Sequence, residues 1–142
     1  MFPLDSKIMI VDDSSFARGA LKTGLKELKY WKILEASDAK SAITIMNEYE
    51  HQADPIHLLI TDFHMLDMTG LDLLKWVRNH EKMRTMPVIV VTSSQEKTVI
   101  LEAGKLGVTN YMIKPFDQNT LKDKLSSAWT KHGEKYFAHV KR

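Results

Sequence analysis

The chain has 142 residues, of which 44% are apolar and 27% charged, and this fits one globular domain with a real hydrophobic core. It contains no Cys, which excludes disulfides, thiolate metal sites and thiol nucleophiles. Residues 1–5 lack the charged and apolar regions of a signal peptide, and no apolar run is long enough to span a membrane. We therefore expect a cytoplasmic protein without membrane insertion.

The net charge of +2 says little about binding partners. Basic residues gather only near the C-terminus, where one acidic residue opposes four basic ones: Glu134 against Lys131, Lys135, Lys141 and Arg142. A solvated helix end accounts for such a cluster, so no nucleic-acid partner is expected.

Short β-rich runs alternate with amphipathic helical stretches along the whole chain. Strands are predicted at residues 7–11, 32–36, 57–61, 87–91 and 110–113. Helices are predicted after a cap at Ser14 or Ser15, after Asp38, from Gly70, around residues 99–106 and from about Asp117. Strands that alternate with helices favour right-handed crossovers, so we expect an α/β fold with a five-stranded parallel sheet covered on both faces.

No linker, repeat or low-complexity segment divides the sequence. We therefore predict a single domain over residues 1–142, with a core of about residues 7–133. Residues 134–142 are interpreted as an extension of the last helix that projects beyond the compact fold.

Polar residues follow four of the predicted strands. Asp12 and Asp13 follow the first, Asp62 the third, Thr92 the fourth and Lys114 the fifth. Ligands of open parallel sheets bind outside the carboxyl ends of the strands, so we expect these side chains to converge there. Each of these polar residues, taken alone, is more often part of a helix cap or a turn. Their occurrence together, each at the end of a strand, indicates a binding site.

The residue types at these strand ends suit phosphoryl chemistry. Three carboxylates held together repel one another unless a cation joins them. Mg²⁺ prefers oxygen ligands and is often held by one or two carboxylates together with a phosphate. Lys114 would add a positive charge and Thr92 a hydroxyl donor, and an Asp can serve as the nucleophile in phosphoryl transfer.

With these motifs the sequence resembles the receiver domain of two-component response regulators, in particular the single-domain chemotaxis type. The resemblance covers about residues 7–133. It rests on the segments at 8–13 (IMIVDD), 59–65 (LITDFHM), 69–71 (TGL), 87–93 (PVIVVTS) and 111–116 (YMIKPF). It implies the flavodoxin-like strand order 2-1-3-4-5. Leu66 and His64 depart from the common pattern of the acceptor loop.

The resemblance also implies a role for each matched residue. Asp62 would be the phosphoacceptor, and Mg²⁺ would be bound by Asp12, Asp13, Asp62 and the backbone carbonyl of His64. Lys114 would contact the phosphoryl oxygens, and the peptide bond before Pro115 is expected to be cis. Thr92 and Tyr111 would form the switch.

For partners, the resemblance implies a histidine kinase or phosphotransfer protein as phosphodonor and a downstream target protein. The target would bind a surface that includes Lys97, Tyr111 and Lys124. Such a protein catalyses its own phosphorylation and slow dephosphorylation only, and is not a conventional enzyme.

One alternative is an aspartate-nucleophile phosphohydrolase of the haloacid dehalogenase type. That family typically carries a second Asp two residues after the nucleophile, where this chain has His64. The nucleophile here also follows the third strand, so the receiver interpretation is favoured.

Overall fold

The computed structural model describes residues 1–93 and 97–140; Lys141 and Arg142 of the basic C-terminal cluster lie outside the described residues. Within these ranges one parallel sheet has the order β2-β1-β3-β4-β5, which confirms the predicted fold class and strand order. The strands are β1 (Ile8–Val11), β2 (Ile33–Ala36), β3 (Leu58–Asp62), β4 (Val88–Thr92) and β5 (Asn110–Ile113). The helices are α1 (Ser15–Glu27), α2 (Ala39–His51), α3 (Gly70–Asn79), α4 (Lys97–Lys105), α5 (Gln118–Ala128), the π-helical η1 (Trp129–Gly133) and α6 (Glu134–Val140).

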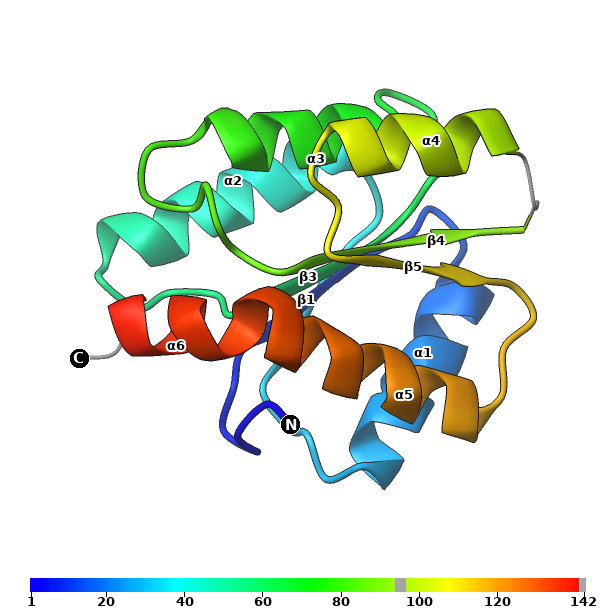
Figure 1. Cartoon of the computed structure of the whole chain (residues 1–142), viewed down its shortest axis with the longest axis horizontal. Coiled ribbons are helices and arrows are strands. Elements are labelled where there is room, and N and C mark those ends of the chain that lie inside the picture. The colour runs from blue at the N-terminus through cyan, green and yellow to red at the C-terminus, as the bar shows by residue number, and fades with distance from the viewer. Residues whose placement is uncertain (94–96, 141–142) are drawn as a thin grey trace.

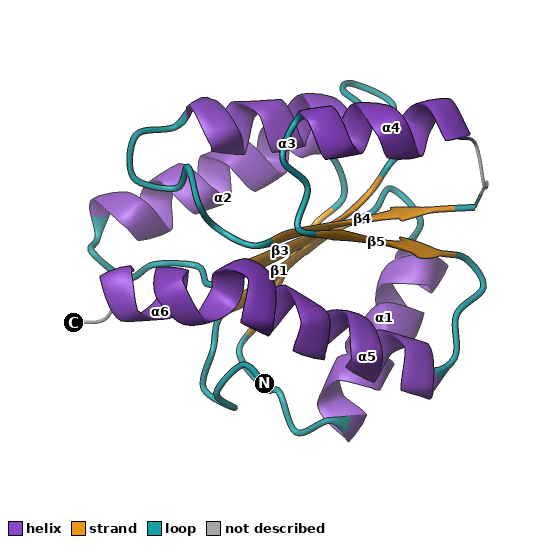
Figure 2. Cartoon of the chain, viewed as in Figure 1, coloured by secondary structure: helices purple, strands orange, loops and turns teal. Residues whose placement is uncertain are grey.

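The sheet lies between two layers of helices. Figure 1 shows α2, α3 and α4 on one face and α1 and α5 on the other, and Figure 2 shows the strands enclosed between them. Successive residues of β1 therefore alternate between two apolar cores: Ile8 and Ile10 pack in one, Met9 and Val11 in the other. A strand buried on both faces needs an unbroken apolar run, which is the pattern that predicted it.

Helix boundaries follow local capping chemistry. Ser14, Asp38 and Asp117 each accept a hydrogen bond from a backbone N–H in the first turn of the helix that follows. Gly107, just beyond α4, has a φ of +79°, a conformation that glycine adopts without steric cost. Across residues 1–93 and 97–140, no helix combines the length and apolar character needed to cross a bilayer.

The expectation that the chain projects beyond the compact fold after residue 133 is wrong for the described residues 134–140. Tyr136 and Val140 are only 2% and 8% exposed and belong to the core on the α2–α4 side. Ala128, at the end of α5, belongs to the opposite core. The continuous α5–η1–α6 helix seen in Figure 1 therefore passes from one core to the other, and α6 is part of the compact fold.

Candidate functional site

The sequence-predicted polar residues meet at one edge of the sheet. Asp62 and Thr92 are the last residues of β3 and β4, one residue beyond the predicted strand ends, while Asp12 and Lys114 directly follow β1 and β5. The parallel register pairs Asp62 with Val91 and Thr92 with Ile113, which brings neighbouring strand ends to the same level. The predicted convergence is therefore found.

Three carboxylates form the centre of this site. Asp12, Asp13 and Asp62 each place one oxygen within 4.8 Å of the others. Asp12 and Asp62 are 7% and 8% exposed, whereas Asp13 is open to solvent. An arrangement of hard oxygen donors with one open side suits a divalent cation that keeps several water ligands.

Lys114 links the two buried carboxylates. Its Nζ lies 2.7 Å from Asp12 Oδ2 and 3.0 Å from Asp62 Oδ1. Burial alone would lower the pKa of Lys114, but its hydrogen bonds to Asp12 and Asp62 outweigh that effect and raise it. Lys114 is therefore a fixed positive charge at neutral pH.

The charge balance of the site remains negative. Burial raises the pKa of Asp62, Lys114 lowers it, and the neighbouring Asp12 and Asp13 raise it further, with a net shift upward. One ammonium thus does not fully stabilise the ionised form of Asp62. This group of side chains therefore needs an additional cation to balance its negative charge.

Local backbone bonds hold Asp12 and Lys114 in place. Asp12 Oδ1 accepts from the backbone N–H of Ser14 at 2.9 Å, and Arg18 donates to the Asp12 carbonyl at 2.6 Å. The Lys114 N–H donates to the Thr92 carbonyl at 2.7 Å, and the Lys114–Pro115 peptide bond is cis, as expected. Both side chains therefore reach the site from rigid strand ends.

The loop between β3 and α3 is fixed at two points. The Gly70 N–H donates to the Phe63 carbonyl at 2.8 Å, and a Cβ at Gly70 would collide with the Asp62 carbonyl oxygen. Asp67 accepts from the backbone N–H groups of Lys40 at 3.0 Å and Ala39 at 3.3 Å, at the first turn of α2. Nothing in the sequence near Asp67 indicates this contact, because its partners lie 27 and 28 positions away.

The contacts of Asp67 stabilise its ionised form. Slight burial opposes ionisation, but the backbone N–H groups of Lys40, Met68 and Ala39 lower the pKa of Asp67 overall. The start of α2 carries a partial positive charge, which also favours a carboxylate. Asp67 therefore anchors the loop that carries His64.

The residues predicted to form the switch and the partner-binding surface differ in their element and in their exposure. Thr92 is buried at the end of β4, while Tyr111 in β5 is half-buried. Lys124 Nζ lies 4.9 Å from the centroid of the Tyr111 ring, so these two predicted residues are neighbours. Lys97 is exposed at the first position of α4.

His64 lies outside the buried part of the site. Its side chain is exposed and its ring packs edge-on against Phe63, with centroids 4.5 Å apart. Two large apolar residues in the segments that follow Asp13 and Asp62 are also exposed: Phe16, which the sequence patterns did not single out, is 87% exposed, and Leu66 is 93% exposed. Exposed side chains of this size next to a site are suited to contact a partner.

Fold and site together define a phosphorelay-type signalling domain, and the comparisons agree. The sequence model of the response regulator receiver domain matches residues 8–126, and the chain belongs to this family. CheY of Pseudomonas aeruginosa is 37% identical over 119 residues, 84% of this chain and 92% of that protein. CheY1 of Helicobacter pylori strain 26695 is 40% identical over 119 residues, 84% of this chain and 93% of that protein.

Solved structures show the same likeness. CheY4 of Vibrio cholerae superposes with a TM-score of 0.76 at 26% identity, covering 87% of this chain and 98% of that one. CheY is itself a standard example of the strand order 2-1-3-4-5. The chain is therefore a CheY-like response regulator receiver, a signalling protein.

Proposed function

We propose that Asp62 accepts a phosphoryl group from a phosphohistidine of a histidine kinase or phosphotransfer protein. An Asp62 carboxylate oxygen would form the new P–O bond while the P–N bond to the donor imidazole breaks. Lys114, which already lies 3.0 Å from Asp62, would neutralise charge on the phosphoryl oxygens. The observation that carries this proposal is the burial of Asp62 between a fixed ammonium and two further carboxylates.

Mg²⁺ is the proposed cofactor. Asp12, Asp13, Asp62 and the backbone carbonyl of His64 would hold it, and the carboxylate cluster fits this ion because all its donors are oxygens. When bound, Mg²⁺ would supply the positive charge that Lys114 alone does not. Asp12 and Lys114 would keep their places because strand ends and backbone bonds fix them.

Output would pass to a downstream target protein in the cytoplasm. Thr92 would bond the phosphoryl group and Tyr111 would change position with it, which alters the surface near Lys97 and Lys124. The CheY relatives are named chemotaxis proteins, and a target in a chemotaxis-like pathway is proposed here. The phosphohydrolase alternative is not favoured, because the family match covers residues 8–126 and His64 replaces the expected acid.

Incubation with acetyl phosphate and Mg²⁺, followed by mass spectrometry, tests the acceptor. We expect one added phosphoryl group on Asp62, with none in Asp62→Asn. Asp123→Asn is a matched control, because Asp123 is exposed on α5. Equal modification of Asp62→Asn and the parent would show that another residue is the acceptor.

A further inference from the structure

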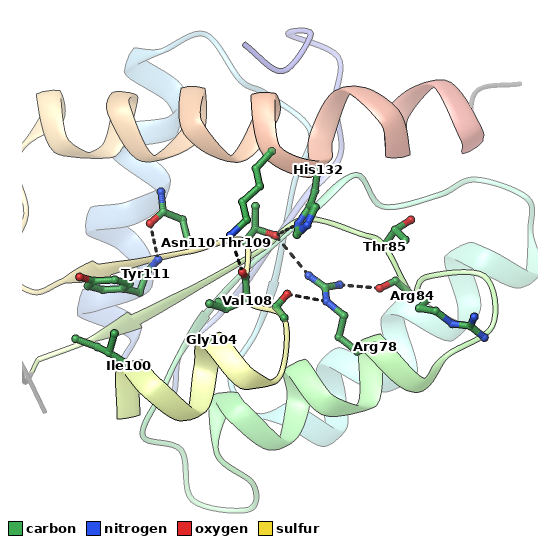
Figure 3. Close-up of a pocket in the computed structure, with 12 residues that line it drawn as sticks. Arg78, Arg84, Thr85, Ile100, Gly104, Val108, Thr109, Asn110, Tyr111 and His132 are labelled. Atoms are coloured by element: carbon green, nitrogen blue, oxygen red, sulfur yellow. Dashed lines mark hydrogen bonds between the residues drawn. The ribbon is translucent and has the colours of Figure 1, made fainter. Parts of the chain in front are cut away.

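A cavity of about 470 Å³, lined by basic and apolar side chains, lies between α4 and η1 (Figure 3). Its wall includes Arg78 from α3, Thr109 just before β5, Tyr111 in β5, and Lys131 and His132 from η1. Lys131 and His132 lie beyond residues 8–126, so part of this wall comes from outside the segment that the family model matches. None of the residues in the acidic cluster contributes to it.

Arg78 is the central cation of this cavity. Its Nε donates to the Gly107 carbonyl at 2.9 Å, and one terminal nitrogen donates to the carbonyls of Arg84 at 3.0 Å and Met86 at 2.6 Å. The other terminal nitrogen approaches Thr109 Oγ1 at 3.4 Å. Among the described residues these contacts use four of the five guanidinium N–H groups, which leaves one donor for a ligand.

No carboxylate balances the charge of Arg78 within residues 1–93 and 97–140. By contrast, basic side chains elsewhere in the protein have acidic partners: Arg18 contacts Glu35, and Lys114 contacts Asp12. Burial accordingly lowers the pKa of Arg78 to about 10. A half-buried guanidinium without a counter-ion is stabilised when an anion binds beside it.

The other charges of the cavity have the same sign. Arg84 and Lys131 also line it, and among the described residues no Asp or Glu does. Lys131 Nζ reaches the Val108 carbonyl only at 3.5 Å, so its ammonium is weakly engaged. A concave surface with one sign of charge concentrates ions of the opposite sign.

Thr109 and His132 hold the base of the cavity in a defined arrangement, visible in Figure 3. Thr109 Oγ1 accepts from the Val88 N–H at 2.8 Å, so its hydroxyl proton is available to His132 Nδ1, also at 2.8 Å. Burial, with help from Arg78 and Lys131, lowers the pKa of His132. The lowered pKa favours the neutral form of His132 at pH 7.

We propose that this cavity, the Arg78 pocket, binds a phosphate-bearing small molecule. Lys131 and the remaining N–H of Arg78 would contact its oxyanion, and Ile100 and Tyr111 would lie beside its organic part. The volume falls in the range of about 300–1,000 Å³ that is usual for small-molecule sites. This inference concerns a site separate from Asp62, and its test uses the unphosphorylated protein; Tyr111 is the one residue that the pocket shares with the proposed switch.

Amide and arginine Nε–H NMR signals test the proposal in Mg²⁺-free buffer at constant ionic strength. Pyrophosphate and ADP are the probes, and a hexaglutamate peptide is added in a separate titration. We expect saturable shifts at Arg78, Gly107 and Thr109 with at least one phosphate probe. If ADP binds more tightly than pyrophosphate, the organic part of the ligand also contacts the pocket. If the two bind equally tightly, the affinity comes from the oxyanion. Both results support the proposal.

Lys131→Gln is the diagnostic variant, and Lys122→Gln is the charge-matched control, because Lys122 is exposed on α5 and does not line the cavity. Loss of one charge-assisted contact should weaken probe binding about tenfold in Lys131→Gln. Lys131 is exposed, so its replacement leaves the fold intact. Unsaturable shifts, equal affinity in Lys131→Gln and the parent, or binding of hexaglutamate alone would overturn the proposal.

Discussion

The ammonium of Lys114 and the carboxylate of Asp12 lie 2.7 Å apart although 102 positions separate them in the sequence. The contact exists because β1 and β5 run parallel and end at the same edge of the sheet. Lys114 forms ion pairs with both Asp12 and Asp62, so its single positive charge is shared by two carboxylates. The exposed Asp13 is therefore the carboxylate on which a further cation most depends.

Replacing Asp13 with Ala should raise the Mg²⁺ requirement. Loss of a charged oxygen ligand should increase the Mg²⁺ concentration for half-maximal phosphorylation by acetyl phosphate about tenfold or more. Phosphorylation can be followed by intact mass across a Mg²⁺ titration, with Asp123→Ala as the control. Equal phosphorylation of the parent in EDTA and in Mg²⁺ would contradict a magnesium requirement.

His64→Asn should shorten the lifetime of the aspartyl phosphate. The exposed imidazole beside Phe63 is proposed to obstruct the approach of water, and a smaller side chain would open that path. The decay of phosphorylated protein can be measured by intact mass after removal of acetyl phosphate. His51→Asn, on the exposed end of α2, is the control. An unchanged or longer lifetime in His64→Asn would argue against obstruction.

Phosphorylation should change the surface around Tyr111. Lys124 lies over the Tyr111 ring at 4.9 Å, so movement of the ring should also displace the lysine. We expect beryllofluoride, a phosphoryl mimic, to shift the amide signals of Lys97, Tyr111 and Lys124. A few kcal/mol of differential affinity would suffice to switch a partner on. Shifts confined to residues around Asp62 would rule out this route.

Stability should fall in mild acid because of His57. Burial, followed by the charge of Lys7, lowers the pKa of His57 to about 4, and its Nδ1 accepts from the Lys7 N–H at 2.9 Å. Between pH 6.5 and 4 the unfolded chain binds a proton at this residue that the folded chain does not. The free energy of unfolding should therefore decrease as the pH falls through this window.

Urea unfolding at pH 7 and pH 5 measures this effect. After allowance for solvent screening, the His57 contribution to the loss should be about 1–2 kcal/mol. His57→Asn, whose amide oxygen can accept the same bond, should lose less stability on acidification than the parent. His139→Asn is the control, because His139 is exposed. The same pH dependence in His57→Asn and the parent would assign the effect to other groups.

The sequence by itself determined the sheet and the polar residues at its edge. Strands such as β1 and β4 are short apolar runs, and a strand covered on both faces requires such a run. Asp62, Thr92 and Lys114 were identified because they follow those runs directly. Caps such as Asp38 were identifiable because the bond that they accept lies within the next turn of chain.

Tertiary structure alone decided the contacts between segments that are distant in sequence. Asp67 reaches the start of α2, and Arg78 meets Thr109 and the η1 residue His132 around a shared cavity. Tyr136 is buried because the last helix continues from one core into the other, whereas its sequence alone suggested a projecting end. Capping and periodicity act over one or two turns, whereas these contacts depend on how whole elements pack, and packing is not encoded in any local pattern.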